Sequence, residues 1–281
     1  MPTLTSPKIS VQETGYDYQD DHDHRLHHSK TNGAVSISAE LFEKLYLAPK
    51  TEVSGELRRT FGNPTPIGLV GFLIALTPLA CDLMQWRGAG GSGATGIPQF
   101  FFFGGLLQFT AGLLEWVLGN TFPAAIFCTY AAFFLSFGST LNPSFAAFSS
   151  FAPAGEDAST GLTTQAFNAG FGFFLVFMGL LSLIFLVCAF RTNVCFVIVF
   201  MALVFTFAFL TVAYWLLAED YQGNAATANH FVIIGGGCAF VCCAAGWWIL
   251  FALVLESVEF PFQLPVGDLS RLVKPRVHVP V

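Results

Sequence analysis

The stretch GNPTPIGLVGFLIALTP, residues 62–78, places a polar, proline-containing opening in front of a long apolar run. Asparagine often caps the start of a helix, and proline is tolerated in the first helical turn, where its missing N–H has no intrahelical partner. Asn63, Pro64 and Pro66 therefore predict the start of a helix. Capping does not require the second proline or the two glycines that follow it. We expect those glycines to let a neighbouring helix or a permeating solute come close.

The composition of the whole chain is that of a membrane protein. Of its 281 residues, 54% are hydrophobic and 11% are charged, whereas soluble domains carry about 25% charged residues. The mean hydropathy is +0.64. Between Arg59 and Arg271 the only Lys or Arg residues are Arg87 and Arg191. So long a region with so few basic residues predicts a polytopic membrane domain.

Long apolar runs define the spans. A helix needs about 20 mostly apolar residues to cross a bilayer, and six runs qualify, at about 65–84, 98–119, 122–140, 166–190, 194–217 and 231–255. A transmembrane barrel would instead show short alternating strands separated by turns. The sequence therefore predicts an all-α membrane protein with six transmembrane helices.

Basic residues predict how the chain is oriented. Pairs or clusters of Lys and Arg favour the cytoplasmic side of a membrane. Basic residues occur before the first span (Arg58 and Arg59), in the fourth loop (Arg191) and after the last span (Arg271, Lys274 and Arg276). Arg87, in the first loop, is the one exception. Six spans bring all three places to one side, so we expect both termini in the cytoplasm.

Three domains are expected from the same pattern. Residues 1–57 form a polar cytoplasmic tail with too few apolar residues to fold by itself, apart from a short amphipathic helix on the membrane surface at residues 38–47. Residues 58–258 form the six-helix transmembrane domain, and residues 259–281 form a second cytoplasmic tail.

Metal and catalytic motifs are not recognisable. The seven cysteines match no zinc spacing, and their odd number argues against a disulfide framework. Four histidines in the tail could hold a metal loosely, but a solvated tail is the simpler interpretation: His22, His24, His27 and His28. No Ser/His/Asp, Cys/His or paired-carboxylate arrangement stands out. We therefore predict no cofactor, no metal site and no enzymatic activity.

The second span carries the most informative polar residues. Gly105, Gly112 and Gly119 are seven residues apart, which is nearly two helical turns, so they form one smooth stripe suited to helix packing. Gln108 and Glu115 form the adjacent stripe. An ionisable residue inside a span costs about 2.5–3.5 kcal/mol on insertion scales, so it faces a partner or a cavity. Both a buried structural hydrogen bond and a solute or proton path remain open.

Two separate motifs resemble the acetate uptake transporter family, which includes bacterial succinate–acetate permeases and fungal acetate permeases. NPTPIGL resembles the NPAPLGL signature of that family, and the pattern GG..Q..AG..E...GNTF.......Y matches its second and third spans. The resemblance covers residues 63–254. It implies a homohexamer in the plasma membrane, with a pore through each six-helix subunit and proton-coupled uptake of acetate or related small carboxylates, succinate among them.

The resemblance also implies roles for individual residues. The residues of the first motif would line the path at the mouth of the first helix: Asn63, Pro64 and Pro66. A narrow aromatic–aliphatic constriction would be made by Phe72, Tyr130 and Met201. Gln108, Glu115, Asn120 and Thr121 occupy polar positions of the second motif.

Departures from the family motifs leave alternatives open. Thr65 and Ile67 replace the usual Ala and Leu, and Pro123, Ala132 and Phe134 alter the third span. A divergent relative could carry another acid, export ammonium or act as a sensor. An aquaporin-like channel for small neutral solutes is a further alternative, because a second Asn-Pro occurs at residues 142–143. It is disfavoured, since the first Asn-Pro precedes the first span and no Arg follows the second.

Overall fold

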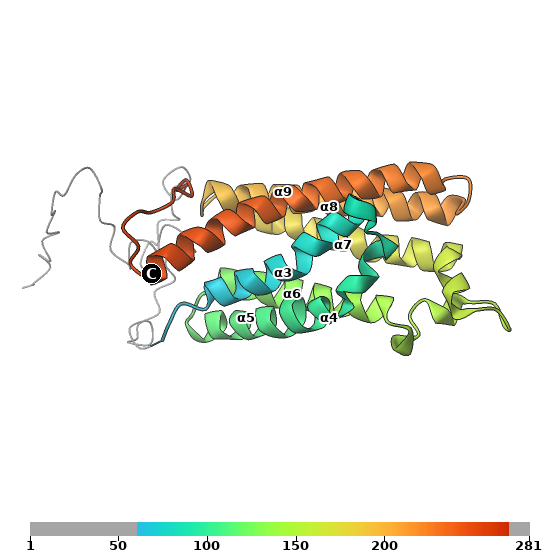
Figure 1. The fold of residues 1–281 in the computed structure, drawn as a ribbon, viewed down its shortest axis with the longest axis horizontal. Coiled ribbons are helices and arrows are strands. Elements are labelled where there is room, and N and C mark those ends of the chain that lie inside the picture. The colour runs from blue at the N-terminus through green and yellow to red at the C-terminus, as the bar shows by residue number, and fades with distance from the viewer. Residues whose placement is uncertain (1–60, 270–281) are drawn as a thin grey trace, which may run out of the picture. The chain divides into compact units, whose positions relative to one another are not determined.

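Helices make up almost all of the part of the chain that the structure describes, residues 61–269 of a computed structural model (Figure 1). The α-helices are α3 (Thr65–Leu83), α4 (Ile97–Gln99), α5 (Gln108–Val117), α6 (Thr121–Leu141), α7 (Gln165–Ala189), α8 (Val194–Glu219) and α9 (Ala225–Ser257). Short 3₁₀ helices lie in the connections: η1 (Trp86–Gly88), η2 (Gly91–Gly96), η4 (Pro143–Phe145), η5 (Ser149–Phe151) and η6 (Ala158–Thr163). A π-helical segment, η3 (Phe100–Leu107), leads into α5.

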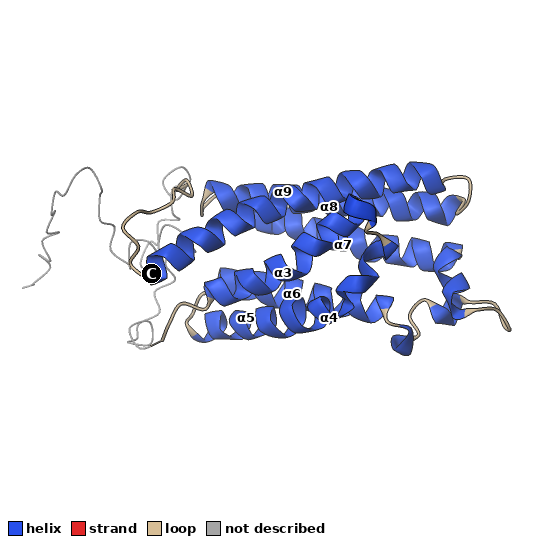
Figure 2. Ribbon diagram, viewed as in Figure 1, coloured by secondary structure: helices blue, strands red, loops and turns tan. Residues whose placement is uncertain are grey.

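Six helical segments are long and apolar enough to cross a membrane, which confirms the six predicted spans. They run over Thr65–Leu83, Gly91–Val117, Thr121–Leu141, Gln165–Ala189, Val194–Glu219 and Ala225–Ser257. No β-strand occurs between residues 61 and 269, so the all-α prediction also holds there (Figure 2). The last helix begins at Ala225, several residues before the apolar run that predicted it, because the polar turn AATANH is helical too.

The helices alternate in direction, so α3, α6 and α8 run one way and α9 runs the other (Figure 1). α8 packs along both α7 and α9, α3 packs on α9, and α5 packs on α6. We name the two ends of this bundle after the first and last residues of α3: the Thr65 end and the Leu83 end. The α7–α8 connection lies at the Thr65 end, and the long α6–α7 connection lies at the Leu83 end.

Large apolar side chains cover the outside of the bundle. Trp116, Phe177 and Val187 are each more than 60% exposed. In water such a surface would be unfavourable, whereas lipid solvates it. The exposed apolar surface therefore agrees with the membrane-spanning assignment made from helix length.

The segment after α9 folds back onto the α7–α8 connection. Val194 N donates to Gly267 O at 2.8 Å and Leu269 N donates to Thr192 O at 3.0 Å. Trp248 Nε1 donates to Pro265 O at 2.9 Å. These bonds attach residues 265–269 to the Thr65 end of the bundle.

Several expectations concern residues outside the described part of the chain. They are the tail over residues 1–57 with its surface helix at 38–47, its four histidines, and the flanking basic residues Arg58, Arg59, Arg271, Lys274 and Arg276.

Candidate functional site

A layer of three side chains lies in the middle of the bundle. Phe72 from α3 meets Tyr130 from α6 edge to face, with ring centroids 5.9 Å apart and an interplanar angle of 68°. Leu203 from α8 completes the layer, and all three side chains are at most 7% exposed. These are the three residues that line both of the small internal cavities described next, so we call them the Phe72 layer.

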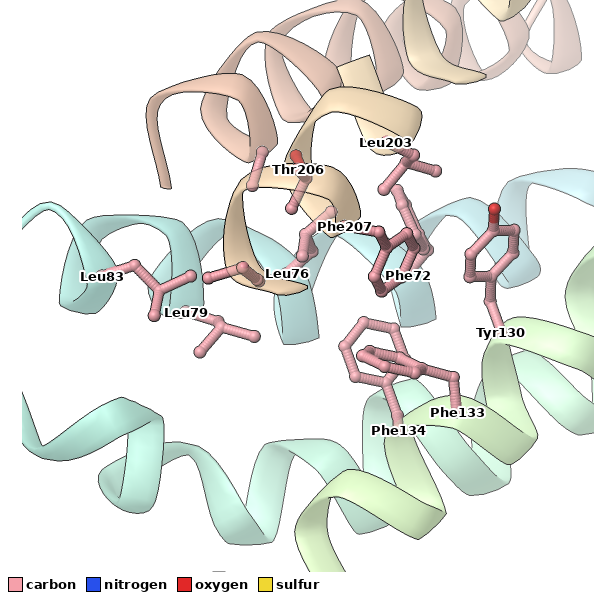
Figure 3. A pocket seen from close by; sticks show the side chains of 12 residues that line it. Phe72, Leu76, Leu79, Leu83, Tyr130, Phe133, Phe134, Leu203, Thr206 and Phe207 are labelled. Carbon is pink, nitrogen blue, oxygen red and sulfur yellow. The ribbon is translucent and has the colours of Figure 1, made fainter. Parts of the chain in front are cut away.

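One cavity lies between the Phe72 layer and the Leu83 end, and we call it the Thr206 cavity. Its volume is about 30 Å³. Figure 3 shows Leu76, Leu79 and Leu83 following one another along α3 away from Phe72, with Thr206 and Phe207 above them on α8. The hydroxyl of Thr206 donates to Ala202 O at 2.8 Å, so the wall offers little free polarity.

The other cavity lies on the opposite side of the layer, and we call it the Gln108 cavity. Its volume is about 20 Å³, and its lining includes Leu69, Gln108, Phe127 and Phe200. A cavity needs roughly 10–15 Å³ to hold one water molecule. In this conformation each cavity therefore has room for one or two waters and for nothing larger.

The two cavities are stacked along the bundle axis. On the parallel helices α3, α6 and α8, residues before the Phe72 layer line the Gln108 cavity and residues after it line the Thr206 cavity. On the antiparallel α9 the order reverses, with Ala239 at the Thr206 cavity and Gly246 at the Gln108 cavity. The Phe72 layer therefore separates two cavities that lie one behind the other within a single chain.

The hydroxyl of Tyr130 is held by α7. It lies 2.8 Å from Ser182 Oγ, and Ser182 Oγ donates to Met178 O at 2.8 Å. A serine hydroxyl has only one proton. Because that proton goes to Met178, Tyr130 donates its own proton to Ser182 and keeps only acceptor lone pairs for other contacts.

Gln108 is the polar residue of the second span that contributes to the lining of a cavity. It is fully buried, and neither Nε2 nor Oε1 has a hydrogen-bond partner among the described residues. It follows directly after the π-helical segment η3. Such π segments often occur at functional sites, because the extra residue in the turn changes the direction in which the next side chains point.

Glycine lets α3 approach the second span at this place. A Cβ added at Gly71 would lie 2.6 Å from Phe103 O and 2.9 Å from Gln108 N. A Cβ at Gly68 would meet the ring of Phe127 at 2.7 Å. Gly68 and Gly71 thus serve the packing of α3 against the third and second spans, the first of the two uses expected of them.

Glu115 belongs to a separate network at the Thr65 end. It is fully buried; Thr65 Oγ1 donates to its Oε1, and Asn120 Nδ2 donates to its Oε2 at 2.6 Å. Gly119, with φ of +77°, follows the end of α5, and Asn120 N donates to Glu115 O at 2.8 Å. The network therefore joins the start of α3, the end of α5 and the start of α6.

The other residues of the two motifs surround this network. Asn63 is exposed, and its Oδ1 accepts a hydrogen bond from Thr65 N at 2.9 Å. Asn63 therefore bonds an N–H of the first turn of α3, although the residue directly before the helix is Pro64. Pro64 is buried and Pro66 is half-buried. Thr121 is exposed at the first position of α6.

Met201 is not brought to the Phe72 layer. Its side chain is 38% exposed and lines an outer groove together with Ile198, Phe205 and Cys238. Leu203 takes the place expected for Met201 beside Phe72 and Tyr130. The sequence of α8 is apolar on every side, so it carries no signal that distinguishes an inward residue from an outward one.

Sequence reasoning also missed Ser182. The only signal was an isolated hydroxyl within a long apolar span, which predicts some buried hydrogen bond but not its partner. Between residues 61 and 269 no group of three or more His, Cys, Asp or Glu side chains is placed to hold a metal ion.

Comparison with known proteins identifies the family. The profile of the GPR1/FUN34/yaaH family matches residues 47–271. Protein alcS of Aspergillus fumigatus is 45% identical over 238 residues, which cover 85% of this chain and 86% of alcS. Acetate permease A of Emericella nidulans is 31% identical over 217 residues, covering 74% of this chain and 67% of the permease.

A solved structure is similar as well. The bacterial acetate channel SatP superposes with a TM-score of 0.51 at 28% sequence identity, covering 74% of this chain and 99% of the SatP chain. These matches confirm the resemblance drawn from the two motifs. With six apolar helices and a profile match over most of its length, the chain belongs to the GPR1/FUN34/yaaH family.

Proposed function

We propose that this protein is a membrane transporter or channel that carries acetate and related small carboxyl compounds, and that it has no enzymatic role. The observation that carries the proposal is the pair of stacked cavities that share Phe72, Tyr130 and Leu203. They lie in line within one chain and adjoin each other at a single level. Relatives named as an acetate permease and an acetate channel supply the substrate class.

The Phe72 layer would act as the selective constriction. A carboxyl compound has to lose part of its hydration to pass an apolar ring of side chains, and hydrophobic constrictions can gate by dewetting. The two small cavities have no room for such a compound in this conformation, so passage requires the side chains that line the cavities to move as well as those of the Phe72 layer. A two-carbon acid needs a smaller displacement than succinate, which would make the layer a size filter.

We also propose that the Thr65 end faces the cytoplasm, in the plasma membrane. The α7–α8 connection with Arg191 lies at this end, whereas Glu156, Asp157 and Glu219 lie toward the other. Hydrogen bonds from the hydroxyl and the backbone N–H of Ser159 hold the pKa of Asp157 below its usual value, so that carboxylate is charged. In intact cells, a cysteine replacing the exposed Glu156 should react with a membrane-impermeant label, and its protection would reverse the orientation.

Uptake coupled to protons and assembly into a homohexamer complete the proposal, and both are supported by the family resemblance. A subunit that contains its own line of cavities does not need its neighbours for the path. The hexamer predicted from the family resemblance should persist in mild detergent, where native mass spectrometry would show six chains. A mass of one or two chains would contradict the hexamer and leave the path unaffected.

The deciding experiment uses purified protein in liposomes. Labelled acetate uptake should exceed that of protein-free liposomes and should rise with an inward proton gradient. Osmotic swelling in water and glycerol, and uptake of labelled methylammonium, should match protein-free liposomes. Swelling without acetate uptake would instead indicate a neutral-solute channel, and methylammonium movement would indicate an ammonium carrier.

A further inference from the structure

We propose that Gln108 recognises the undissociated form of a small carboxylic acid, and that the protein consequently also passes small primary amides such as acetamide. The inference rests on the proposed function, because it concerns the form in which a carboxyl compound crosses the Phe72 layer. It assigns to Gln108 the role of selecting a neutral substrate that both donates and accepts a hydrogen bond.

The state of the Gln108 side chain is the first observation. It is fully buried, it lines the cavity beside Phe72 and Tyr130, and both of its polar atoms lack partners among the described residues. Leaving a buried polar group unpaired is unfavourable. The lining of this cavity is apolar in the present conformation, so the amide meets a ligand only when the side chains around it move. A ligand that then reached the amide would satisfy both of its unpaired groups.

The surroundings of Gln108 disfavour an anion. No Lys, Arg or His lines either cavity, and burying a carboxylate without a countercharge is strongly unfavourable. The carboxylate of Glu115, on the same helix, accepts from Thr65 and Asn120. The one basic side chain on the lining helices is His230, which lies in the first turns of α9 and lines neither cavity. The remaining titratable groups on these helices carry no positive charge: Cys81 and Asp82 on α3, Cys128 and Tyr130 on α6, Cys195, Tyr214 and Glu219 on α8, and Cys238, Cys242, Cys243 and Glu256 on α9.

The second observation is that the hydroxyl proton of Tyr130 is already used in a hydrogen bond within the protein. Tyr130 donates to Ser182, because the Ser182 proton goes to Met178 O. Tyr130 therefore has no proton left to donate to a solute at the layer. A carboxylate, which has only lone pairs, would find no donor in Tyr130.

The hydrogen-bonding groups of the Gln108 carboxamide match those of an undissociated carboxylic acid. A carboxamide has N–H donors and a carbonyl acceptor on one edge. An undissociated acid presents the complementary pair, because its carbonyl accepts from Nε2 of Gln108 and its O–H donates to Oε1. A primary amide presents the same pair through its own C=O and N–H. A carboxylate satisfies only the donor half and leaves Oε1 unpaired.

Uptake by purified protein in liposomes tests this inference, with the rate of protein-free liposomes subtracted because undissociated acids also cross lipid. At a fixed total acetate concentration and equal pH on both sides, the rate should fall about tenfold for each pH unit above the acid's pKa, which is roughly 4–5 as for side-chain carboxyls. A membrane potential set with potassium and valinomycin should not change the rate. Labelled acetamide should be carried at a rate independent of pH and should compete with acetate.

The variant Gln108→Met keeps the side-chain length and removes both hydrogen-bonding groups. It should lower the acetate and acetamide rates together, by about tenfold or more, while Met201→Ala, on the outer groove, serves as the control with both rates unchanged. If Gln108→Met does not fold, the wild-type pH, potential and acetamide measurements still decide the inference.

Three results would overturn it. Acetate uptake that follows the total acetate concentration and responds to the membrane potential would show that the anion passes. Acetamide that is neither carried nor able to compete would show that the pairing is not used. Unchanged rates in a folded Gln108→Met protein would show that Gln108 holds only a structural water. In each case acetate uptake itself remains, so the proposed function stands; it falls only if no acetate movement exceeds the protein-free rate.

Discussion

Phe72 stands edge-on to Tyr130 with ring centroids 5.9 Å apart, at the one level that the two internal cavities have in common. Aromatic pairs in this geometry are favourable beyond the area they bury, so the pair is a stable closure rather than a loose contact. Its position in the middle of the bundle makes it the place where size selection should be strongest.

Replacing Phe72 by Ala should shift substrate preference toward larger acids. The change removes most of a ring from the layer, so succinate uptake should rise relative to acetate uptake in liposomes at matched protein content. The matched control is Phe137→Ala, which is equally buried, at 7% exposure, but lines neither cavity. Both variants should lose about 3–5 kcal/mol of stability. A succinate-to-acetate ratio that stays the same in Phe72→Ala would rule out the size filter.

Leu203 and Met201 form a second matched pair, two residues apart on the same helix. Leu203→Ala widens the layer, so it should raise the succinate-to-acetate ratio and should cost about 2–5 kcal/mol of stability because it leaves a cavity. Met201→Ala removes a partly exposed side chain from the outer groove, so neither quantity should change much. If instead Met201→Ala changed the ratio and Leu203→Ala did not, the assignment of the layer would be wrong.

Tyr130 and Ser182 should be coupled energetically. Tyr130→Phe and Ser182→Ala each remove one partner of the same buried hydrogen bond, and each should lower stability by about 1–3 kcal/mol. The double variant should cost less than the sum of the two, because the bond can be lost only once. Denaturation in detergent, analysed as a double-mutant cycle, measures the difference. Additivity within about 0.5 kcal/mol would mean that the two hydroxyls do not interact.

Glu115 should have a structural role, because it bonds the start of α3 to the residue that precedes α6. Glu115→Gln can keep both hydrogen bonds, since the hydroxyl of Thr65 accepts as readily as it donates, so we expect near wild-type stability and an unchanged pH dependence of acetate uptake. Glu115→Leu leaves Thr65 and Asn120 without this partner and should cost about 1–3 kcal/mol for each. Loss of the pH dependence in a folded Glu115→Gln protein would assign proton transfer to Glu115 instead.

Gly71→Ala should disturb the contact between α3 and the second span. The new Cβ would lie 2.6 Å from Phe103 O and 2.9 Å from Gln108 N, both backbone atoms that cannot rotate away. The expected loss is about 1–3 kcal/mol, as for an overpacked core. Gly237→Ala is the control, because a Cβ there meets nothing within 4 Å and alanine favours a helix. Equal melting temperatures for the two variants would contradict the close approach.

Much of the fold could be predicted because the bilayer imposes it. An apolar run of about 20 residues has to form a helix in lipid, where each backbone N–H and C=O must be bonded within the segment. Apolar length alone therefore determined the number of spans and their approximate bounds. The motifs around Asn63 and Gln108 added the family, since their residue types and order are specific.

The site depended on tertiary structure, because lipid and protein interior are both apolar. Leu203 and Met201 are equally suitable for either environment, and only the packing of α8 against its neighbours decided which of them faces Phe72. The same holds for the hydroxyl of Tyr130, whose proton is directed by a serine 52 positions away. The sequence by itself determined that Gln108 and Glu115 lie within one span. The folded chain decided that Glu115 is bonded to two other helices while Gln108 contributes to the lining of a cavity, because contacts between helices distant in the chain depend on how their surfaces fit together.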